Sequence, residues 1–267
     1  SWTKLQAGNF SDVVYKPGDT TVVYAASYDY WGQSNVYKST DGGNQFVRVT
    51  DFGLQKVFLR LVTTPADPNY LGLNMSVDGE KRFYLSKNNA SGFDFVSNMP
   101  ENLVLYFSPK DKSILYCGYV VIYKSVDGGM TWNQITDWWA SGRGLPEIHA
   151  DHHFIGHHPL DPDQLYFGCD GGVYRYREST EQWEELVNGL AITQFYKMDI
   201  SMTNPPVLIG GSQDNGGWVR RSNQSWGNTN GGDAMSQVID PSNPAIGYTE
   251  YWGGNAVYRT TNGFNNL

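Results

Sequence analysis

The chain has 267 residues, of which 40% are hydrophobic, and its formal net charge is −8. A negative field repels phosphate backbones and anionic lipid, so we expect neither a nucleic-acid partner nor direct insertion into a membrane, and a neutral glycan or a polypeptide fits better as a ligand. The two cysteines, Cys117 and Cys169, match neither a disulfide framework nor a zinc pattern, which predicts two unpaired thiols.

In chain order, short β-branched and aromatic runs alternate with turn residues, and the pattern returns after roughly 45 residues. Each repeat contains a proline after an apolar run and, further on, Gly-rich and Asp-Gly turns, which interrupt strands. Each repeat therefore predicts four short strands joined by turns. We place the six repeats at approximately 8–50, 51–98, 99–139, 140–189, 190–229 and 230–267.

The clearest marker of the repeat lies in its last turn. Residues 37–43 read Tyr-Lys-Ser-Thr-Asp-Gly-Gly and residues 123–129 read Tyr-Lys-Ser-Val-Asp-Gly-Gly, and an aromatic residue follows each of them. A third copy at 258–263 reads Tyr-Arg-Thr-Thr-Asn-Gly, and weaker copies lie at 86–93, 177–183 and 221–226. These segments resemble the Asp-box, or bacterial neuraminidase, repeat. We expect Asp41 and Asp127 to be structural, because each carboxylate can accept N–H bonds within its own hairpin.

The repeats and this resemblance predict an all-β fold, a β-propeller of about six four-stranded blades with Asp-box hairpins, formed by a single domain or a fragment of one. The last repeat stops at Leu267, before a fourth strand, whereas residues 1–5 look like an outer strand without its blade. Two interpretations stay open. The two ends complement each other in a closed six-bladed ring, or the chain is part of a larger propeller.

All the histidines of the chain lie at the start of the fourth repeat. Strand alternation would place His149, Asp151 and His153 on one face and His152 on the other. Three interpretations stay open: a metal site formed by the first three residues with Asp170 as a further ligand, ligand binding or acid–base chemistry by His152 or Asp151, and packing against neighbouring blades. We expect no cofactor.

Polar, Gly-rich segments of the fourth to sixth repeats lie at equivalent places, either before the first strand or between the second and third strands. In a propeller such segments converge on one face, so we expect a shared ligand site there. The residues assigned to it are His149, Asp151, His152, His153, Asp170, Gln213, Asp214, Asn215, Tyr251 and Trp252.

Four motifs carry a second resemblance. They are His-Ala-Asp-His-His at 149–153, Asp-Gly-Gly-Val-Tyr at 170–174, Gln-Asp-Asn-Gly at 213–216 and Gly-Gly-Asp at 231–233. Together they resemble large secreted bacterial proteins that are sortilin-like or related to the family 74 glycoside hydrolases, the xyloglucanases. The resemblance implies an extracellular or cell-surface location in a bacterium. The chain lacks the arginine triad and the Phe/Tyr-Arg-Ile-Pro motif of sialidases, so we do not expect sialidase activity.

Xyloglucanases are inverting enzymes, in which two carboxylates lie roughly 6.5–9.5 Å apart so that a water fits between them. Residues 132–139, Trp-Asn-Gln-Ile-Thr-Asp-Trp-Trp, are similar to a segment that carries one of these aspartates in the family. The resemblance implies Asp137 as one catalytic candidate, with Asp233 as the second. The aromatic platforms for sugar rings would be Trp138, Trp139, Tyr251 and Trp252.

Two functions of different classes stay open. The first is a glycan-active protein, either a hydrolase or a binder, that uses the polar cluster of repeats four to six. The second is a non-catalytic, sortilin-like propeller that binds protein or forms part of a cell-surface assembly.

Overall fold

The computed structural model describes residues 2–28, 33–53, 57–139, 142–251 and 256–265, and these residues form strands, turns and loops but no helix. The described part of the chain therefore has no helix that is long and apolar enough to cross a bilayer. The strands form six antiparallel sheets, five of four strands and a last one of three described strands. The all-β fold expected from the turn pattern is confirmed.

We call each sheet a blade and number the blades in chain order; along each blade, every strand pairs with the next strand in the sequence. Blades 1 and 2 consist of β1 (Phe10–Lys16), β2 (Asp19–Ser27), β3 (Val36–Ser39), β4 (Val47–Arg48), β5 (Leu59–Thr63), β6 (Leu71–Val77), β7 (Glu80–Ser86) and β8 (Asp94–Asn98). Blades 3 and 4 consist of β9 (Val104–Phe107), β10 (Leu115–Gly118), β11 (Ile122–Ser125), β12 (Asn133–Gln134), β13 (His152–His158), β14 (Asp161–Cys169), β15 (Gly172–Arg177) and β16 (Gln182–Glu185). Blades 5 and 6 consist of β17 (Phe195–Ile200), β18 (Leu208–Ser212), β19 (Gly217–Arg220), β20 (Trp226–Asn230), β21 (Ala234–Ile239), β22 (Gly247–Tyr251) and β23 (Val257–Thr260).

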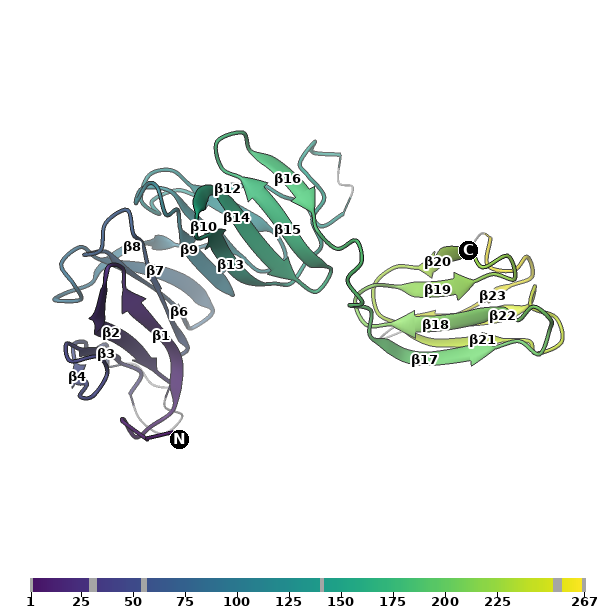
Figure 1. Ribbon diagram of the computed structural model, residues 1–267, viewed down its shortest axis with the longest axis horizontal. Coiled ribbons are helices and arrows are strands. Elements are labelled where there is room, and N and C mark those ends of the chain that lie inside the picture. Colours follow the sequence, from purple (N-terminus) through teal and green to yellow (C-terminus); the bar gives the residue numbers. More distant parts are fainter. Residues whose placement is uncertain (1, 29–32, 54–56, 140–141, 252–255, 266–267) are drawn as a thin grey trace. The chain divides into compact units, whose positions relative to one another are not determined.

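The chain divides into two compact units. Unit 1 combines Ser1–Cys169 with Val173–Leu186 and holds blades 1 to 4, and unit 2 combines Asp170–Gly172 with Val187–Leu267 and holds blades 5 and 6. Within unit 1 the first strand of each blade lies beside the first strand of the next, so that β1, β5, β9 and β13 are the inner strands (Figure 1). Residues 2–5, expected to form an outer strand, are not in a strand.

Blades of unit 1 stack face to face because their strands are apolar on both sides. In β10, Leu115 and Cys117 pack into a core shared with blade 2, whereas Tyr116 between them packs into a core shared with blade 4. This alternation is the period of two that any strand imposes on its side chains. A leucine buried as fully as Leu115 contributes about 2 kcal/mol.

In unit 2, blades 5 and 6 approach so closely that main chain meets main chain. A Cβ added at Gly211 of β18 would lie 1.7 Å from the carbonyl oxygen of Ala234 in β21. Glycine is therefore required at position 211. Ile209, Val219 and Phe264 belong to the buried hydrophobic core of the unit, together with Val207 and Ile239.

The Ser-x-Asp turns of blades 1 and 3 hold themselves together. The Asp41 carboxylate accepts hydrogen bonds from Ser39 Oγ at 2.7 Å and from the N–H of Gln45 at 2.9 Å. The Asp127 carboxylate accepts bonds from Ser125 Oγ at 2.8 Å, from the N–H of Thr131 at 2.9 Å and from Thr131 Oγ1 at 2.6 Å. All of these donors belong to the hairpin of the aspartate itself.

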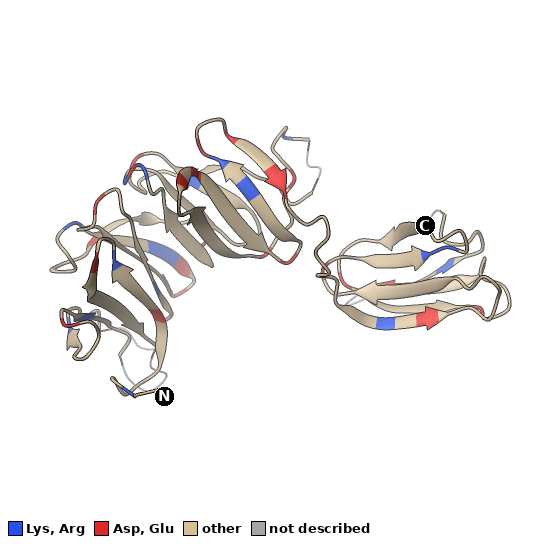
Figure 2. Cartoon of the chain, in the orientation of Figure 1, with Lys and Arg blue, Asp and Glu red and all other residues tan. Residues whose placement is uncertain are grey.

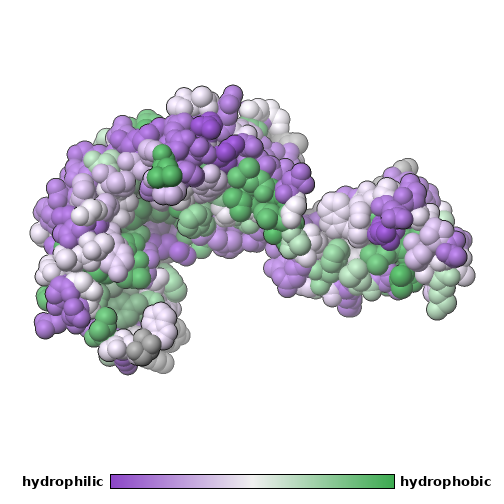
Figure 3. Space-filling model, viewed as in Figure 1, coloured by the Kyte–Doolittle hydropathy of each residue, from purple (hydrophilic) through white to green (hydrophobic). Residues whose placement is uncertain are grey.

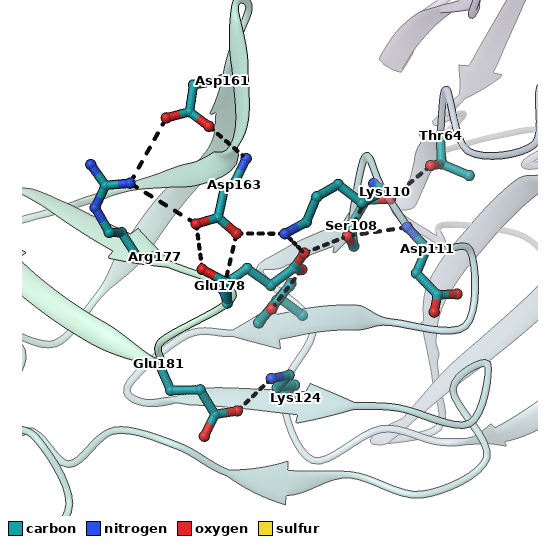
Figure 4. A network of polar contacts seen from close by, with 12 residues as sticks. Thr64, Ser108, Lys110, Asp111, Lys124, Asp161, Asp163, Arg177, Glu178 and Glu181 are labelled. Carbon is teal, nitrogen blue, oxygen red and sulfur yellow. Dashed lines mark hydrogen bonds and ion pairs between the residues drawn. The ribbon is translucent and has the colours of Figure 1, made fainter.

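Blade 4 departs from this pattern. Tyr176-Arg177-Glu178 stands where blade 3 has Tyr123-Lys124-Ser125, so a glutamate replaces the turn serine. The Glu178 side chain is buried and accepts hydrogen bonds from Ser108 Oγ and Tyr116 OH of blade 3, each at 2.9 Å (Figure 4). Lys110 Nζ lies 3.2 Å from the same carboxylate and also pairs with Asp163. Glu178 thus ties blade 4 to blade 3.

We expect Glu178→Ala to lower the free energy of unfolding by about 2–4 kcal/mol, because it leaves the buried Tyr116 and Ser108 hydroxyls without their acceptor. Urea denaturation followed by tryptophan fluorescence measures the change. Glu181→Ala is the matched control, since Glu181 is exposed and its one ion-pair partner among the described residues is Lys124 of the neighbouring blade, and it should cost less than about 1 kcal/mol. Equal losses for the two variants would contradict the assigned role.

The Asp127 turn predicts a pH dependence. Hydrogen bonds from the Thr131 hydroxyl and N–H lower the pKa of Asp127 to about 2. Since the folded-state pKa lies below the unfolded value, the ionised carboxylate stabilises the fold above pH about 4, and this contribution is lost as the pH falls from about 4 towards 2. In urea denaturation at a series of pH values, the stability difference between the parent chain and Asp127→Asn should shrink over that interval. A stability difference that stays constant down to pH 2 would contradict the contribution assigned to the ionised Asp127 carboxylate.

Candidate functional site

Unit 2 brings together three of the polar turns expected to form a site. Asn215 Nδ2 donates to the carbonyl oxygen of Asp170 at 3.3 Å, and the N–H of Asp214 donates to Asp233 Oδ1 at 2.9 Å. The N–H of Gly216 donates to the carbonyl oxygen of Gly232 at 2.8 Å. Segments that are far apart in the sequence, 170–172, 213–216 and 230–233, therefore form one polar surface.

The local backbone of 213–216 explains how these side chains are held. Asp214 and Gly216 both adopt the left-handed conformation, with φ of 57° and 75°. A Cβ at Gly216 would lie 2.2 Å from the carbonyl oxygen of Asn230, so only glycine fits there. Trp218 Nε1 donates to the carbonyl oxygen of Asn215 at 2.8 Å, and the N–H of Gln213 donates to the carbonyl oxygen of Gln194 at 2.9 Å. The turn is thus fixed on both sides.

Of the site residues predicted in or next to blade 6, the structure describes Asp233 and the backbone of Tyr251. Asp233 is half-buried at the entry to β21, where its carboxylate meets the Asp214 turn. Tyr251 is the last residue of β22 and pairs with Ala234 through the backbone. Trp252 lies outside the described residues.

In unit 1, Asp137 is held by the backbone on both sides. Its N–H donates to the carbonyl oxygen of Pro146 and its carbonyl oxygen accepts the N–H of Ile148, each at 2.8 Å, which forms a parallel bridge between Asp137 and Glu147. The residue is only 4% exposed, and Oδ1 accepts the N–H of Trp138 at 3.1 Å. Asp137 is therefore a buried residue that fixes the segment after it.

The next two residues project from this segment. Trp138 and Trp139 are 52% and 57% exposed, and their ring centroids lie 6.1 Å apart with planes inclined at 45°. Two exposed indole rings side by side offer a broad apolar surface with N–H groups at its edge, a combination suited to ligands that are apolar on one face and polar at the rim.

The histidine segment differs from expectation. The strand begins only at His152, and Asp151 before it has a left-handed φ of 61°. This turn breaks the alternation that was expected to align His149, Asp151 and His153, so the expectation of one shared strand face is wrong. His152 is fully buried with its ring edge-on to Phe167, whereas His153 is exposed. His149 is half-buried, and its Nδ1 lies 3.1 Å from the carbonyl oxygen of Ala150.

The candidates thus divide between the two units. Unit 1 holds Asp137, Trp138, Trp139, His149, Asp151, His152 and His153, and unit 2 holds Asp170, Gln213, Asp214, Asn215, Asp233 and Tyr251. The two aspartates considered for catalysis, Asp137 and Asp233, belong to different units, so their pairing stays a prediction.

Sequence reasoning missed a groove of about 350 Å³ in unit 1, which is lined by residues of all four inner strands and includes Arg60 and His153. Figure 3 shows hydrophobic side chains at the surface over the inner strands, whereas the outer hairpins of this unit are mostly hydrophilic. An arginine inside a short apolar strand, Leu59-Arg60-Leu61-Val62, is the signal that could have indicated the groove.

Comparison with known proteins agrees with the fold. No protein-family model and no curated protein sequence matches the chain. Among solved structures, it is similar to the GH74 xyloglucanase from Xanthomonas campestris, with 17% sequence identity, a TM-score of 0.53 and coverage of 98% of this chain and 45% of that one. It is also similar to an ancestral GH74 enzyme, with 18% identity, a TM-score of 0.50 and coverage of 97% and 39%. YCF48 from Cyanidioschyzon merolae matches at 10% identity with a TM-score of 0.46, covering 97% of this chain and 83% of that one.

The chain thus spans less than half the length of either glycoside hydrolase. At these identities the likeness shows the fold alone. The chain has the β-propeller fold found in family 74 glycoside hydrolases.

The contact between Asp233 and the Asp214 turn can be tested. We expect Asp233→Ala to increase the rate of hydrogen exchange at the Asp214 amide about fivefold, because a partly exposed bond to a carboxylate contributes about 1 kcal/mol. Exchange followed by NMR measures it. Asp240→Ala is the control, since Asp240 accepts the Ser242 N–H in another turn of unit 2 and should leave the Asp214 amide unchanged. Equal exchange at Asp214 in all three proteins would refute the contact.

Proposed function

We propose that the chain is a glycan-binding β-propeller, in which Trp138 and Trp139 form the platform for sugar rings. The observation that carries the proposal is the pair of adjacent exposed indole rings, 6.1 Å apart. Pyranose rings present apolar C–H faces that stack on aromatic rings, while their hydroxyl groups bond to a polar rim. The net charge of −8 favours a neutral glycan over an acidic one.

The fold likeness to xyloglucanases supports the same ligand class, and it makes a neutral β-glucan the first ligand to test. We further propose that the Ser-x-Asp turns of Asp41 and Asp127 are of the Asp-box type, since each carboxylate is bonded within its own hairpin. Because the resemblance is to secreted bacterial proteins with this repeat, we also propose that the protein acts outside the cell or at the cell surface of a bacterium.

Binding is better supported than hydrolysis. An inverting enzyme needs a carboxylate that faces a water molecule and the sugar, with a second carboxylate opposite. Asp137 is buried, and one of its oxygens already accepts the N–H of Trp138. A carboxylate in this position orients the segment of Trp138 and Trp139. Catalysis by Asp137 and Asp233 is the alternative to binding alone, and it is tested together with it.

We expect xyloglucan oligosaccharides to bind to the parent chain, and Trp138→Ala and Trp139→Ala to weaken binding about tenfold each, the equivalent of about 1.4 kcal/mol per stacked ring. Isothermal titration calorimetry measures the affinities. The matched control is Phe95→Ala, which removes an aromatic ring that is 54% exposed on β8 and should leave the affinity unchanged.

Reducing-sugar release in the same samples decides between binder and hydrolase. Turnover that Asp137→Asn abolishes would establish hydrolysis and overturn the binding-only assignment. Absence of any glycan affinity would overturn the proposal as a whole, and would favour the protein-binding, sortilin-like alternative.

A further inference from the structure

The groove over the inner strands of unit 1 is a second site of different chemistry. It measures about 350 Å³ and receives side chains from β1, β5, β9 and β13. Most of its lining is aliphatic or aromatic, and β9 and β13 carry no Lys, Arg, Asp or Glu at all (Figure 2). A charged group in this setting has few neighbours to compensate it.

Arg60 is the cation of the groove. It is the second residue of β5 and is half-buried, and its guanidinium makes no hydrogen bond or ion pair with the part of the chain that the structure describes. The other arginines of unit 1 all have acceptors, namely Asp51 for Arg48, Glu80 for Arg82, Gln134 for Arg143, Glu184 for Arg175 and Asp161 for Arg177. A guanidinium has five N–H donors in a planar fork, which fits a carboxylate in bidentate geometry.

Among the described residues, Asp12 is the single carboxylate that lines the groove, and each of its two oxygens accepts a main-chain N–H. Oδ2 accepts the N–H of Leu61 and Oδ1 accepts the N–H of Val13, each at 2.8 Å. Asp12 therefore joins blade 1 to blade 2, and no hydrogen bond or ion pair links its carboxylate to the Arg60 guanidinium. Its charge still opposes anions, which favours a ligand of one negative charge over a doubly charged phosphate.

The side chains that line the groove around Arg60 indicate the chemistry of the rest of the ligand. Phe154 is 59% exposed at the groove, and Val14 and Leu105 add aliphatic surface. Tyr106 OH is bonded to His157 Nδ1, so this hydroxyl is already engaged. The surroundings of Arg60 thus suit an apolar ligand body.

We propose that this groove binds a small carboxylic acid with an apolar body, whose carboxylate pairs with Arg60 while the body packs on Phe154. The site is independent of the glycan platform at Trp138 and Trp139, so either assignment can fail without the other.

The test uses the full chain and three probes in NMR titrations. Phenylacetate supplies the carboxylate and the apolar body, phenylacetamide is its neutral isostere, and glucuronate is a carboxylate with a polar body. We expect phenylacetate to bind with a dissociation constant of about 1 mM, the strength usual for a ligand of this size, and to shift resonances of β5 and β13. Both other probes should bind at least about tenfold more weakly.

Arg60→Met keeps the length of the side chain without its charge and should abolish phenylacetate binding, whereas Arg60→Lys should weaken it severalfold. Arg82→Met, on β7 outside the groove, is the matched control and should bind as the parent chain does. Equal binding of phenylacetate and phenylacetamide by the parent chain would overturn the proposal, and this comparison needs no variant to fold. Unchanged binding by a folded Arg60→Met chain, or no saturable binding of phenylacetate, would overturn it as well.

Discussion

Each sheet of unit 1 that lies between two others must be apolar on both faces, and the rest of the structure follows from this constraint. Adjacent residues of one strand, such as Leu115 and Tyr116, belong to two different cores. A shift of register by one residue would exchange the side chains of the two cores and place residues of different size and shape in each of them. The turns therefore have to end every strand at a defined residue, and the self-contained bonds of Asp41 and Asp127 do this without help from neighbouring blades.

A lysine of the third strand contacts the next blade at both the blade 1–blade 2 and the blade 3–blade 4 junctions. Lys38 of blade 1 donates to the carbonyl oxygen of Asn89 in blade 2, and Lys124 of blade 3 pairs with Glu181 at the equivalent place in blade 4. The buried tyrosines next to these lysines differ. Tyr116 OH donates to Glu178, whereas Tyr24 OH is buried without a partner among the described residues. Blade 2 has the shorter Ser86 where blade 4 has Glu178, so the length of one side chain accounts for the difference.

The features that could be predicted from the sequence are those with local causes. Proline and Asp-Gly turns interrupt strands wherever they stand, so the alternation of strands and turns follows from residue type. The convergence of 170–172, 213–216 and 230–233 could also be predicted, because equivalent loops of neighbouring blades lie on the same face of a propeller. The features that could not be predicted depend on contacts distant in the sequence or on a single backbone angle. The left-handed Asp151 stands just before the start of β13, Asp137 is buried and bridged to Glu147, and the isolation of Arg60 depends on what four separate strands place around it.

The contact between Gly211 and Ala234 has a consequence for how this chain can diverge. Every other amino acid carries a Cβ, and at position 211 that atom would overlap a main-chain oxygen that no rotamer change can move. Side chains elsewhere in the core of unit 2 can be exchanged for others of similar volume, with compensation by their neighbours. At Gly211 no single substitution can be compensated by neighbouring side chains in this way. Descendants of this protein can replace the glycine only if the β18–β21 approach is rebuilt in the same event, so this position should stay invariant while the residues around it drift.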